Sequence, residues 1–237
     1  MIYHEHCSKK EFCGMIDYAL LAQNNPKEKL DRFCDDTVNY GFASLCIFPC
    51  DVAYAKKRMG DRGKVCAVVG YPMGANSTHT KVFEALDCID DGADEIDVVM
   101  NISRFMDGDD EYVLGELRQV VNAAKAKDPK VVVKVIIEVY HLDRDEDLVR
   151  ACELVIASGA DFIKQATGYA PDPYHNTCGL ENIARIREIA SDRIAIKSAG
   201  VPDSLEQMIQ MYKEYDITRF GGRFNDWIDG ADDSVWD

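Results

Sequence analysis

Three charged side chains stand inside short apolar runs, where a dry strand would normally carry only hydrocarbon. Asp97 stands in EIDVVMN, Lys164 in DFIKQATG and Lys197 in IAIKSAG. Because successive side chains of a strand point to opposite faces, the apolar neighbours of each charge belong to the other face. We therefore expect all three charges to face the interior of a closed sheet. A charge buried there needs either an ion-pair partner or a catalytic role.

Two of these charges are lysines on consecutive apolar runs, and consecutive strands are neighbours in a barrel. For either lysine alone, a structural ion pair at the barrel mouth is the simpler interpretation. Two ammonium groups close together repel each other, and desolvation adds to this effect, so the neutral amine is favoured. A neutral lysine can attack a carbonyl carbon. The sequence therefore predicts a catalytic pair, Lys164 and Lys197, with Asp97 transferring protons and balancing the charge.

Other residues at the predicted strand ends are weaker candidates. Cys46, in SLCIFP, is either a small buried residue or a thiol that lines a pocket. Thr167, in QATG, either hydrogen-bonds a substrate hydroxyl or closes its strand. Lys134 and Glu138 share one face of KVIIEV, so we expect them to pair inside the barrel or to line its pocket.

If the charged residues face the interior of a closed sheet, the chain must contain a series of strands that form it. Eight short apolar runs qualify, at 15–20, 44–49, 65–72, 95–100, 134–139, 162–167, 194–199 and 218–222. Most are near-continuous, which is typical of parallel strands covered on both faces. Helical segments separate them, so the pattern predicts an α/β fold, a (β/α)8 TIM barrel, with residues 1–237 as a single domain. A doubly wound open sheet is the alternative, but LAQNNP follows the first run where that fold places a Gly-rich turn.

Capping residues mark several helix boundaries. We expect Asn25 to cap a helix with Pro26 at its first position, and Gly41 to end it. Gly92 and Gly159 should end two later helices in the left-handed conformation. The faces that share the i, i+3, i+4 spacing are Leu30, Phe33, Cys34 and Val38; Val82, Phe83, Leu86 and Ile89; and Leu148, Cys152, Val155 and Ile156.

Composition excludes several classes of function. The net charge of −15 repels nucleic-acid phosphates and anionic lipids, so we expect neither partner, and a site for an anionic substrate must be a local exception. Nine cysteines without a CxxC motif indicate reduced thiols and a cytoplasmic location.

His4, His6 and Cys7 resemble metal ligands only by type, and we expect a frayed terminus there. The sequence has no P-loop, HExxH motif, signal peptide or run of transmembrane length.

The order of these segments resembles the deoxyribose-phosphate aldolase family, class I aldolases with a barrel fold. The resemblance runs through IDYALLAQNNPKEKLDRFCDDTVNYGFASLCIFP, VVGYPMGANSTHTKVFEA, GADEIDVVMNISRFMDGD, KVIIEVYHL, SGADFIKQATGY and IKSAG. It implies that Lys164 forms a Schiff base, and that Asp97 and Lys197 transfer protons. It also implies cleavage of 2-deoxy-D-ribose 5-phosphate to glyceraldehyde 3-phosphate and acetaldehyde. The iminium is the electron sink, so no metal or cofactor is expected, and the family assembles as homodimers or homotetramers.

The resemblance also implies where the substrate binds. In the family, a phosphate cup is formed by the segments after the two lysine strands and by the end of the last strand, from backbone N–H groups, hydroxyls and a helix N-terminus. The residues that we assign to substrate binding are Cys46, Thr167, Gly168, Gly200, Gly221, Gly222 and Arg223.

The chain departs from the family in this cup. Gly200 is followed by VPDS, where members usually have a second glycine, and the last strand ends FGGRF instead of Gly-x-Ser-Ser. Pro202 removes a donor, Asp203 adds like charge, and Tyr169 stands where Lys or Phe is usual. Arg223 could replace the lost hydroxyls by a charged contact. The hypotheses are therefore an aldolase on the sugar phosphate, a related class I aldolase on a non-phosphorylated or differently charged substrate, and a non-catalytic barrel that binds a sugar or aldehyde.

Overall fold

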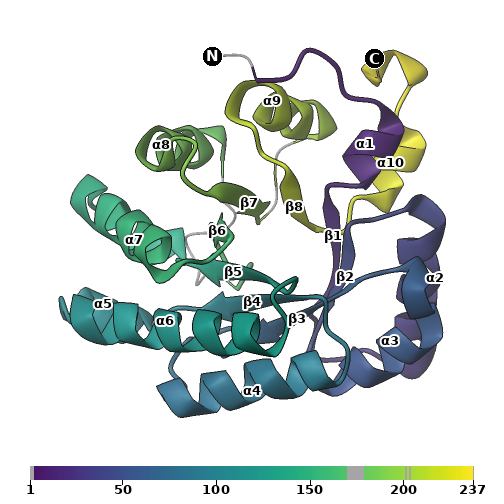
Figure 1. Ribbon diagram of the computed structural model, residues 1–237. Coiled ribbons are helices and arrows are strands. Elements are labelled where there is room, and N and C mark those ends of the chain that lie inside the picture. Colours follow the sequence, from purple (N-terminus) through teal and green to yellow (C-terminus); the bar gives the residue numbers. More distant parts are fainter. Residues whose placement is uncertain (1–2, 170–178, 201, 203, 237) are drawn as a thin grey trace.

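Eight parallel strands close into a barrel in this computed structural model, which describes residues 3–169, 179–200, 202 and 204–236 (Figure 1). The strands are β1 Ile16–Leu20, β2 Ser44–Ile47, β3 Val65–Val69, β4 Glu95–Val99, β5 Val132–Ile136, β6 Phe162–Lys164, β7 Ala195–Ala199 and β8 Arg219–Gly222. They pair in sequence order, and β8 pairs with β1. The TIM barrel expected from the eight apolar runs is confirmed. The open-sheet alternative is wrong, because the closed sheet leaves no edge strand.

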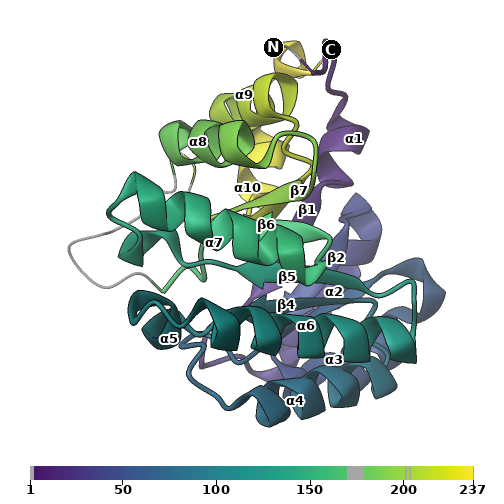
Figure 2. The same ribbon diagram turned by 60° about the vertical axis from the view of Figure 1, so that its left-hand side comes forward.

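Helices surround the barrel. They are α1 Lys9–Cys13, α2 Lys27–Tyr40, α3 Val52–Met59, α4 Thr78–Asp90, α5 Ile102–Met106, α6 Asp110–Lys127, α7 Asp145–Ser158, α8 Leu180–Ala190, α9 Leu205–Tyr215 and α10 Asn225–Gly230. Figure 2 shows α8, α7, α6 and α4 stacked in succession along one side. Within the described part of the chain, none of these helices has the length and apolar character that crossing a membrane requires.

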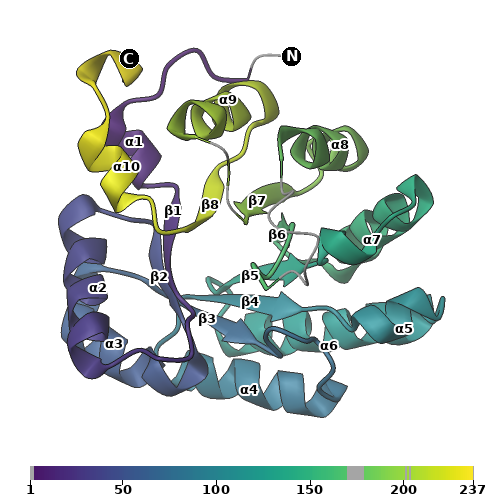
Figure 3. The same ribbon diagram turned by 180° about the vertical axis from the view of Figure 1, so that it is seen from behind.

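Both ends of the chain pack beside the barrel. Helix α1 and helix α10 lie side by side between α9 and α2 (Figures 1 and 3). The N-terminal residues before α1 are also fixed: the His4 ring stacks on Tyr212 at 4.0 Å between ring centroids, and its Nε2 lies 2.7 Å from Asp216 Oδ1. Cys7 is buried. The expectation of a frayed terminus is therefore wrong from residue 3 onward.

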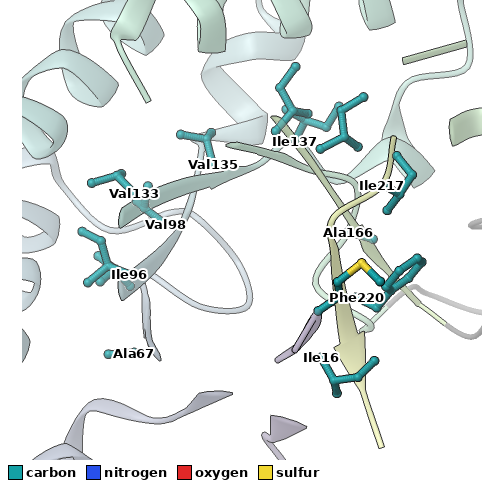
Figure 4. Packing of buried hydrophobic residues seen from close by; sticks show 14 of the residues in the cluster. Ile16, Ala67, Ile96, Val98, Val133, Val135, Ile137, Ala166, Ile217 and Phe220 are labelled. Carbon is teal, nitrogen blue, oxygen red and sulfur yellow. The ribbon is translucent and has the colours of Figure 1, made fainter. Parts of the chain in front are cut away.

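The strands present two different faces. Apolar side chains such as Ile16, Ile96, Val133 and Phe220 face the helices and are almost completely buried there (Figure 4). The alternate positions point into the barrel, where a separate small apolar cluster includes Cys46. The main hydrophobic core therefore lies between sheet and helices. Because burial of this outer face stabilises the fold, the barrel interior can carry charge.

Several strands end earlier than the apolar runs suggest. β5 covers 132–136 where 134–139 was expected, and Glu138 beyond it has a φ of 49°, which is incompatible with a strand. β6 ends at Lys164, three residues before the expected boundary. Gly70, with a φ of 64°, ends β3 before the expected residue 72. The residues that follow these ends form loops at the C-terminal mouth of the barrel, where barrel enzymes place their sites.

The start of α2 differs from the expectation. Pro26 occupies the N-cap position and makes no side-chain capping bond. Asn25, the expected cap, instead donates from Nδ2 to the carbonyl oxygen of Ala22 at 2.5 Å and accepts from Lys29 Nζ at 3.2 Å. The expected end is confirmed, because Gly41 has a φ of 69°. Asn25 therefore fixes the loop before the helix.

Helix α4 is rotated relative to the expected face. Its buried positions are Lys81, Ala85 and Cys88, whereas Phe83 is 70% exposed. Lys81 can be buried because its Nζ donates to Glu116 Oε1 of α6 at 2.7 Å and to a backbone carbonyl of β4 at 2.8 Å. The ion pair between α4 and α6 therefore decides which face of α4 is buried, and the apolar spacing within α4 does not. In α7 the expected face is largely confirmed, with Ile156 half-buried.

Candidate active site

The three charges singled out in the sequence meet inside the barrel. Lys164 Nζ donates to Asp97 Oδ2 at 2.8 Å, and Lys197 Nζ donates to the same oxygen at 2.7 Å. Strands β6 and β7 are neighbours, and their register pairs Lys164 directly with Lys197. All three side chains are almost inaccessible to solvent. The two ammonium groups therefore share one buried carboxylate that separates their charges.

Four further charged residues, which the sequence did not single out as a group, extend this arrangement. Lys134 Nζ lies 2.9 Å from Asp97 Oδ1 and 2.6 Å from Glu95 Oε2. Arg219 Nη1 lies 2.7 Å from Glu95 Oε2 and 2.8 Å from Asp17 Oδ1. Asp17 Oδ2 in turn accepts from Lys197 at 2.5 Å. We refer to the seven residues as the central ion cluster: Asp17, Glu95, Asp97, Lys134, Lys164, Lys197 and Arg219.

The cluster keeps Asp97 ionised. Burial alone would raise the pKa of Asp97, but the ammonium groups of Lys134, Lys164 and Lys197 outweigh burial and hold that pKa well below its usual range. Burial alone would lower the pKa of Lys197, but Asp17 and Asp97 outweigh it and raise the pKa above its usual value. Lys197 is therefore held as a cation beside Asp97.

Two thiols border the cluster inside the barrel. Cys46 of β2 and Cys66 of β3 are paired in register, and Cys66 Sγ lies 3.2 Å from Asp97 Oδ1. A hydrogen bond from Cys66 lowers the pKa of Cys46, whereas burial raises the pKa of Cys66 well above its usual value. Cys46 is thus the more readily ionised thiol of the pair.

Two sets of donor atoms lie close enough together to hold a metal ion. One set is Cys46, Cys66 and Asp97, and the other is Asp17, Cys66 and Glu95, each within 4.8 Å. Their carboxylates already accept ion pairs from the lysines and the arginine of the central ion cluster. Those positive charges would repel an added cation, so we assign no metal site here.

A cavity of about 410 Å³ opens where the strands end. Lys164 and Lys197 line it, whereas Asp97 lies fully buried behind them. The residues expected to bind substrate all line this cavity: Cys46, Thr167, Gly168, Gly200, Gly221, Gly222 and Arg223. Sequence reasoning missed its aromatic wall, Tyr71, Phe224 and Trp227, and the side chain of Lys29.

Two tyrosines connect loops across this mouth. Tyr71 Oη donates to the backbone oxygen of Thr167 at 2.6 Å, and Tyr169 Oη donates to the backbone oxygen of Leu21 at 2.6 Å. The two rings meet edge to face at 5.7 Å, and Lys164 Nζ lies 6.0 Å from the Tyr71 ring centroid. Tyr169 therefore links the loop after β6 to the loop after β1.

Thr167 and Glu138 form a pair of their own. Thr167 Oγ1 donates to Glu138 Oε2 at 2.5 Å and accepts from the backbone N–H of Tyr169 at 3.0 Å. Burial raises the pKa of Glu138. The expected pairing of Lys134 with Glu138 is wrong, because the chain turns at Glu138 and carries its side chain to the β6 loop. The hydroxyl of Thr167 is already engaged within the protein.

The glycines at the end of β8 make room for side chains. A Cβ atom on Gly222 would lie 2.3 Å from the Phe224 ring, and one on Gly221 would lie 3.0 Å from Lys197 Cε. Gly200 has a φ of 113°, which side-chain-bearing residues rarely adopt. In the altered VPDS segment, Pro202 is buried, whereas Val201 and Asp203 lie outside the described residues.

The fold and the site together define a class of protein. A (β/α)8 barrel whose cavity is lined by two buried lysines sharing one carboxylate has the arrangement of a class I aldolase, a carbon–carbon lyase. The chain belongs to the DeoC/LacD aldolase family, because the family model described as "DeoC/LacD family aldolase" matches residues 13–215.

Individual relatives agree with this family. The deoxyribose-phosphate aldolase of Thermoanaerobacter pseudethanolicus is 41% identical over 188 residues, which cover 78% of this chain and 81% of that protein. The solved structure of QR15, an aldolase, is 33% identical with a TM-score of 0.79, covering 89% of this chain and 90% of that one. The deoxyribose phosphate aldolase of Aeropyrum pernix is 26% identical with a TM-score of 0.77, covering 90% and 87%.

Proposed function

We propose that this enzyme cleaves and forms the bond between C2 and C3 of 2-deoxy-D-ribose 5-phosphate through a Schiff base on Lys164. The observation that carries the proposal is the sharing of one Asp97 oxygen by Lys164 and Lys197 at the edge of the cavity. The name of the Thermoanaerobacter relative, 41% identical, supports the substrate.

In the proposed cleavage, the neutral amine of Lys164 attacks the aldehyde carbon of the open-chain sugar, and loss of water gives an iminium ion. A base removes the proton from the C3 hydroxyl, the C2–C3 bond breaks, and its electron pair flows into the iminium. Glyceraldehyde 3-phosphate leaves, and an enamine remains on Lys164. Protonation of the enamine and addition of water then release acetaldehyde and restore the amine. In this proposal Asp97 takes up and returns protons, and its 2.8 Å hydrogen bond from Lys164 Nζ supports that role.

The charges of the central ion cluster support a nucleophilic Lys164. The cluster sets four basic side chains against three carboxylates, and all seven residues are largely buried. Release of one proton from Lys164 leaves three cations facing three carboxylates. The cluster is thus balanced when Lys164 is the free amine that attacks the substrate. Lys197, held as a cation, stays available to donate hydrogen bonds to the reacting groups.

The other hypotheses have less support. A barrel that binds without turnover would not need a lysine pair around a shared carboxylate, and such buried charges are costly. A lyase on a non-phosphorylated or differently charged substrate was suggested by the altered cup. The comparisons do not favour it, since relatives that span most of the chain carry the name deoxyribose-phosphate aldolase.

Chemical trapping tests the proposal. Incubation with acetaldehyde and borohydride should reduce the iminium to a stable ethyl adduct, which peptide mass spectrometry places on Lys164. The Lys164→Met variant should yield no adduct. A wild-type protein with no adduct, or with adducts on other lysines only, would show that the proposed Schiff base does not form.

We further infer a cytoplasmic, single-domain enzyme that assembles as a homodimer or homotetramer. The eight described cysteines form no disulfide with one another and seven are buried, which supports a reducing compartment. The Aeropyrum pernix relative is described as a tetramer, which supports assembly. Light scattering of the purified protein measures the assembly state directly.

A further inference from the structure

The active-site cavity is positively charged in a strongly acidic protein. The chain has a net charge of −15, yet the described residues that line the cavity include four basic side chains and no carboxylate. Lys164 and Lys197 are tied to Asp97, so their charges are partly balanced. The other two are Lys29, in the first turn of α2, and Arg223, directly after β8. Such a local reversal of charge attracts an anionic group.

Lys29 and Arg223 form no ion pair with the described residues. Lys29 Nζ donates to the neutral amide of Asn25 at 3.2 Å and lies 6.0 Å from the Phe33 ring, with no ion pair in the described part of the chain. Across the same residues, Arg223 makes neither a hydrogen bond nor an ion pair. Both side chains line the cavity and also a second groove, in which Asp36 and Asp226 are the acidic lining residues. Their donors are therefore available to a ligand.

The phosphate cup expected from the family resemblance is less suited to bind an anion in this protein. Helix α9 follows the second lysine strand, and its N-terminus is capped from within: Ser204 Oγ accepts from the backbone N–H of Gln207 at 3.2 Å. Glu206 adds a negative charge to the first turn of the same helix. At the end of β8, the Phe224 ring and the Lys197 stem occupy the space beside Gly222 and Gly221. Recognition by backbone N–H groups is thus weakened at the start of α9.

We propose that Lys29, together with Arg223, binds the anionic end of the substrate, and that recognition by two side-chain cations replaces recognition by backbone donors. The inference rests on the proposed aldolase function, which places the carbonyl end at Lys164. An arginine offers two parallel donors to a phosphate, and a lysine adds a compact charge. Lys29 is then a specificity-determining residue. It belongs to helix α2, whereas the family's phosphate cup uses the loops that follow the strands of the two catalytic lysines.

Kinetics with matched sugars tests the inference. We expect Lys29→Met to lower the ratio of kcat/KM for 2-deoxyribose 5-phosphate to kcat/KM for 2-deoxyribose by about tenfold to hundredfold. Arg223→Met should lower it similarly, and Lys29→Arg should restore most of it. Lys27→Met is the matched control, because Lys27 belongs to the same turn but contacts the Tyr54 ring at 4.9 Å outside the cavity. An unchanged ratio in Lys29→Met, or an equal fall in Lys27→Met, overturns the inference.

A binding measurement separates this inference from the aldolase proposal. Inorganic phosphate should raise the unfolding temperature of the wild type above the value in chloride at equal ionic strength, because it binds only the folded state. Lys29→Met and Arg223→Met should lose this shift. No shift in the wild type overturns the inference. Acetaldehyde trapping at Lys164 needs no phosphate, so its failure counts against the aldolase proposal alone.

Discussion

Replacing Asp97 with asparagine is the sharpest single perturbation of the central ion cluster. The substitution keeps the size of the side chain, removes its charge and replaces one acceptor oxygen by an NH2 donor. Asp97 accepts ion pairs from three lysines within 2.9 Å. In the variant, Lys134 retains Glu95 and Lys197 retains Asp17, whereas Lys164 keeps no carboxylate partner in the part of the chain that the structure describes.

The expected loss of stability follows from burial. Removing one partner from a fully buried ion pair costs about 3–5 kcal/mol, because the remaining charge stays uncompensated. With a denaturant slope of about 2–3 kcal/mol per M, this corresponds to a fall of about 1–2 M in the urea midpoint. Glu153→Gln is the control. It breaks an ion pair of 2.6 Å with Arg193 at the exposed surface, and should hardly move the midpoint.

The expected loss of activity follows from the proton-transfer role that we propose for Asp97. We expect Asp97→Asn to reduce kcat for cleavage by about 10²–10⁴-fold, the usual contribution of a positioned acid or base. The assay couples release of glyceraldehyde 3-phosphate to a dehydrogenase, under conditions where urea titration shows the variant to be folded. A kcat within tenfold of the wild type would refute the proton-transfer role. An unchanged urea midpoint would refute the energetic account of the cluster.

Two further outcomes follow from buried charges. Because the folded-state pKa of Asp97 is lowered below the unfolded value of about 3.9, its stabilisation is present above that value and is lost as pH falls through the folded pKa. The urea midpoint should therefore drop as the pH falls below about 4, and it should drop less steeply in Asp97→Asn; equal slopes would contradict this. Outside the site, Lys81→Met should destabilise the protein by about 3–5 kcal/mol by leaving Glu116 buried without its partner, and the double variant Lys81→Met/Glu116→Leu should recover most of the loss. Thermal or urea unfolding of both variants checks the second outcome, and a double variant no more stable than the single one would contradict it.

The barrel could be predicted because its signals are local. Apolar runs, glycine caps and helical spacing recur along the chain, and each can be recognised without knowing its neighbours in space. The same holds for Asp97, Lys164 and Lys197, since a charge inside an otherwise apolar run is visible in one strand. The rotation of α4 could not be predicted, because burial of Lys81 depends on Glu116, far along the chain in another helix.

The site residues that could not be predicted from the sequence were missed for a different reason. Asp17, Glu95 and Arg219 stand near strand ends, where a polar residue needs no explanation, and only closure of the barrel brings them together. Lys29 belongs to a helix rich in charged residues, so its spacing does not distinguish it from Lys27. Its place in the cavity depends on how the first turn of α2 meets the end of β8.

The central ion cluster also limits how this sequence can change over time. Its seven residues come from six strands, and each carboxylate serves more than one cation. Removing any one of the three carboxylates leaves an excess of buried positive charge, so we expect single substitutions of Asp17, Glu95 or Asp97 to destabilise the protein even where a paired change would fold. Viable mutational paths must exchange charges in pairs, which makes epistasis strong inside the barrel and weak at its mouth. Libraries intended to alter substrate choice should therefore vary the cavity mouth and leave the central charges fixed.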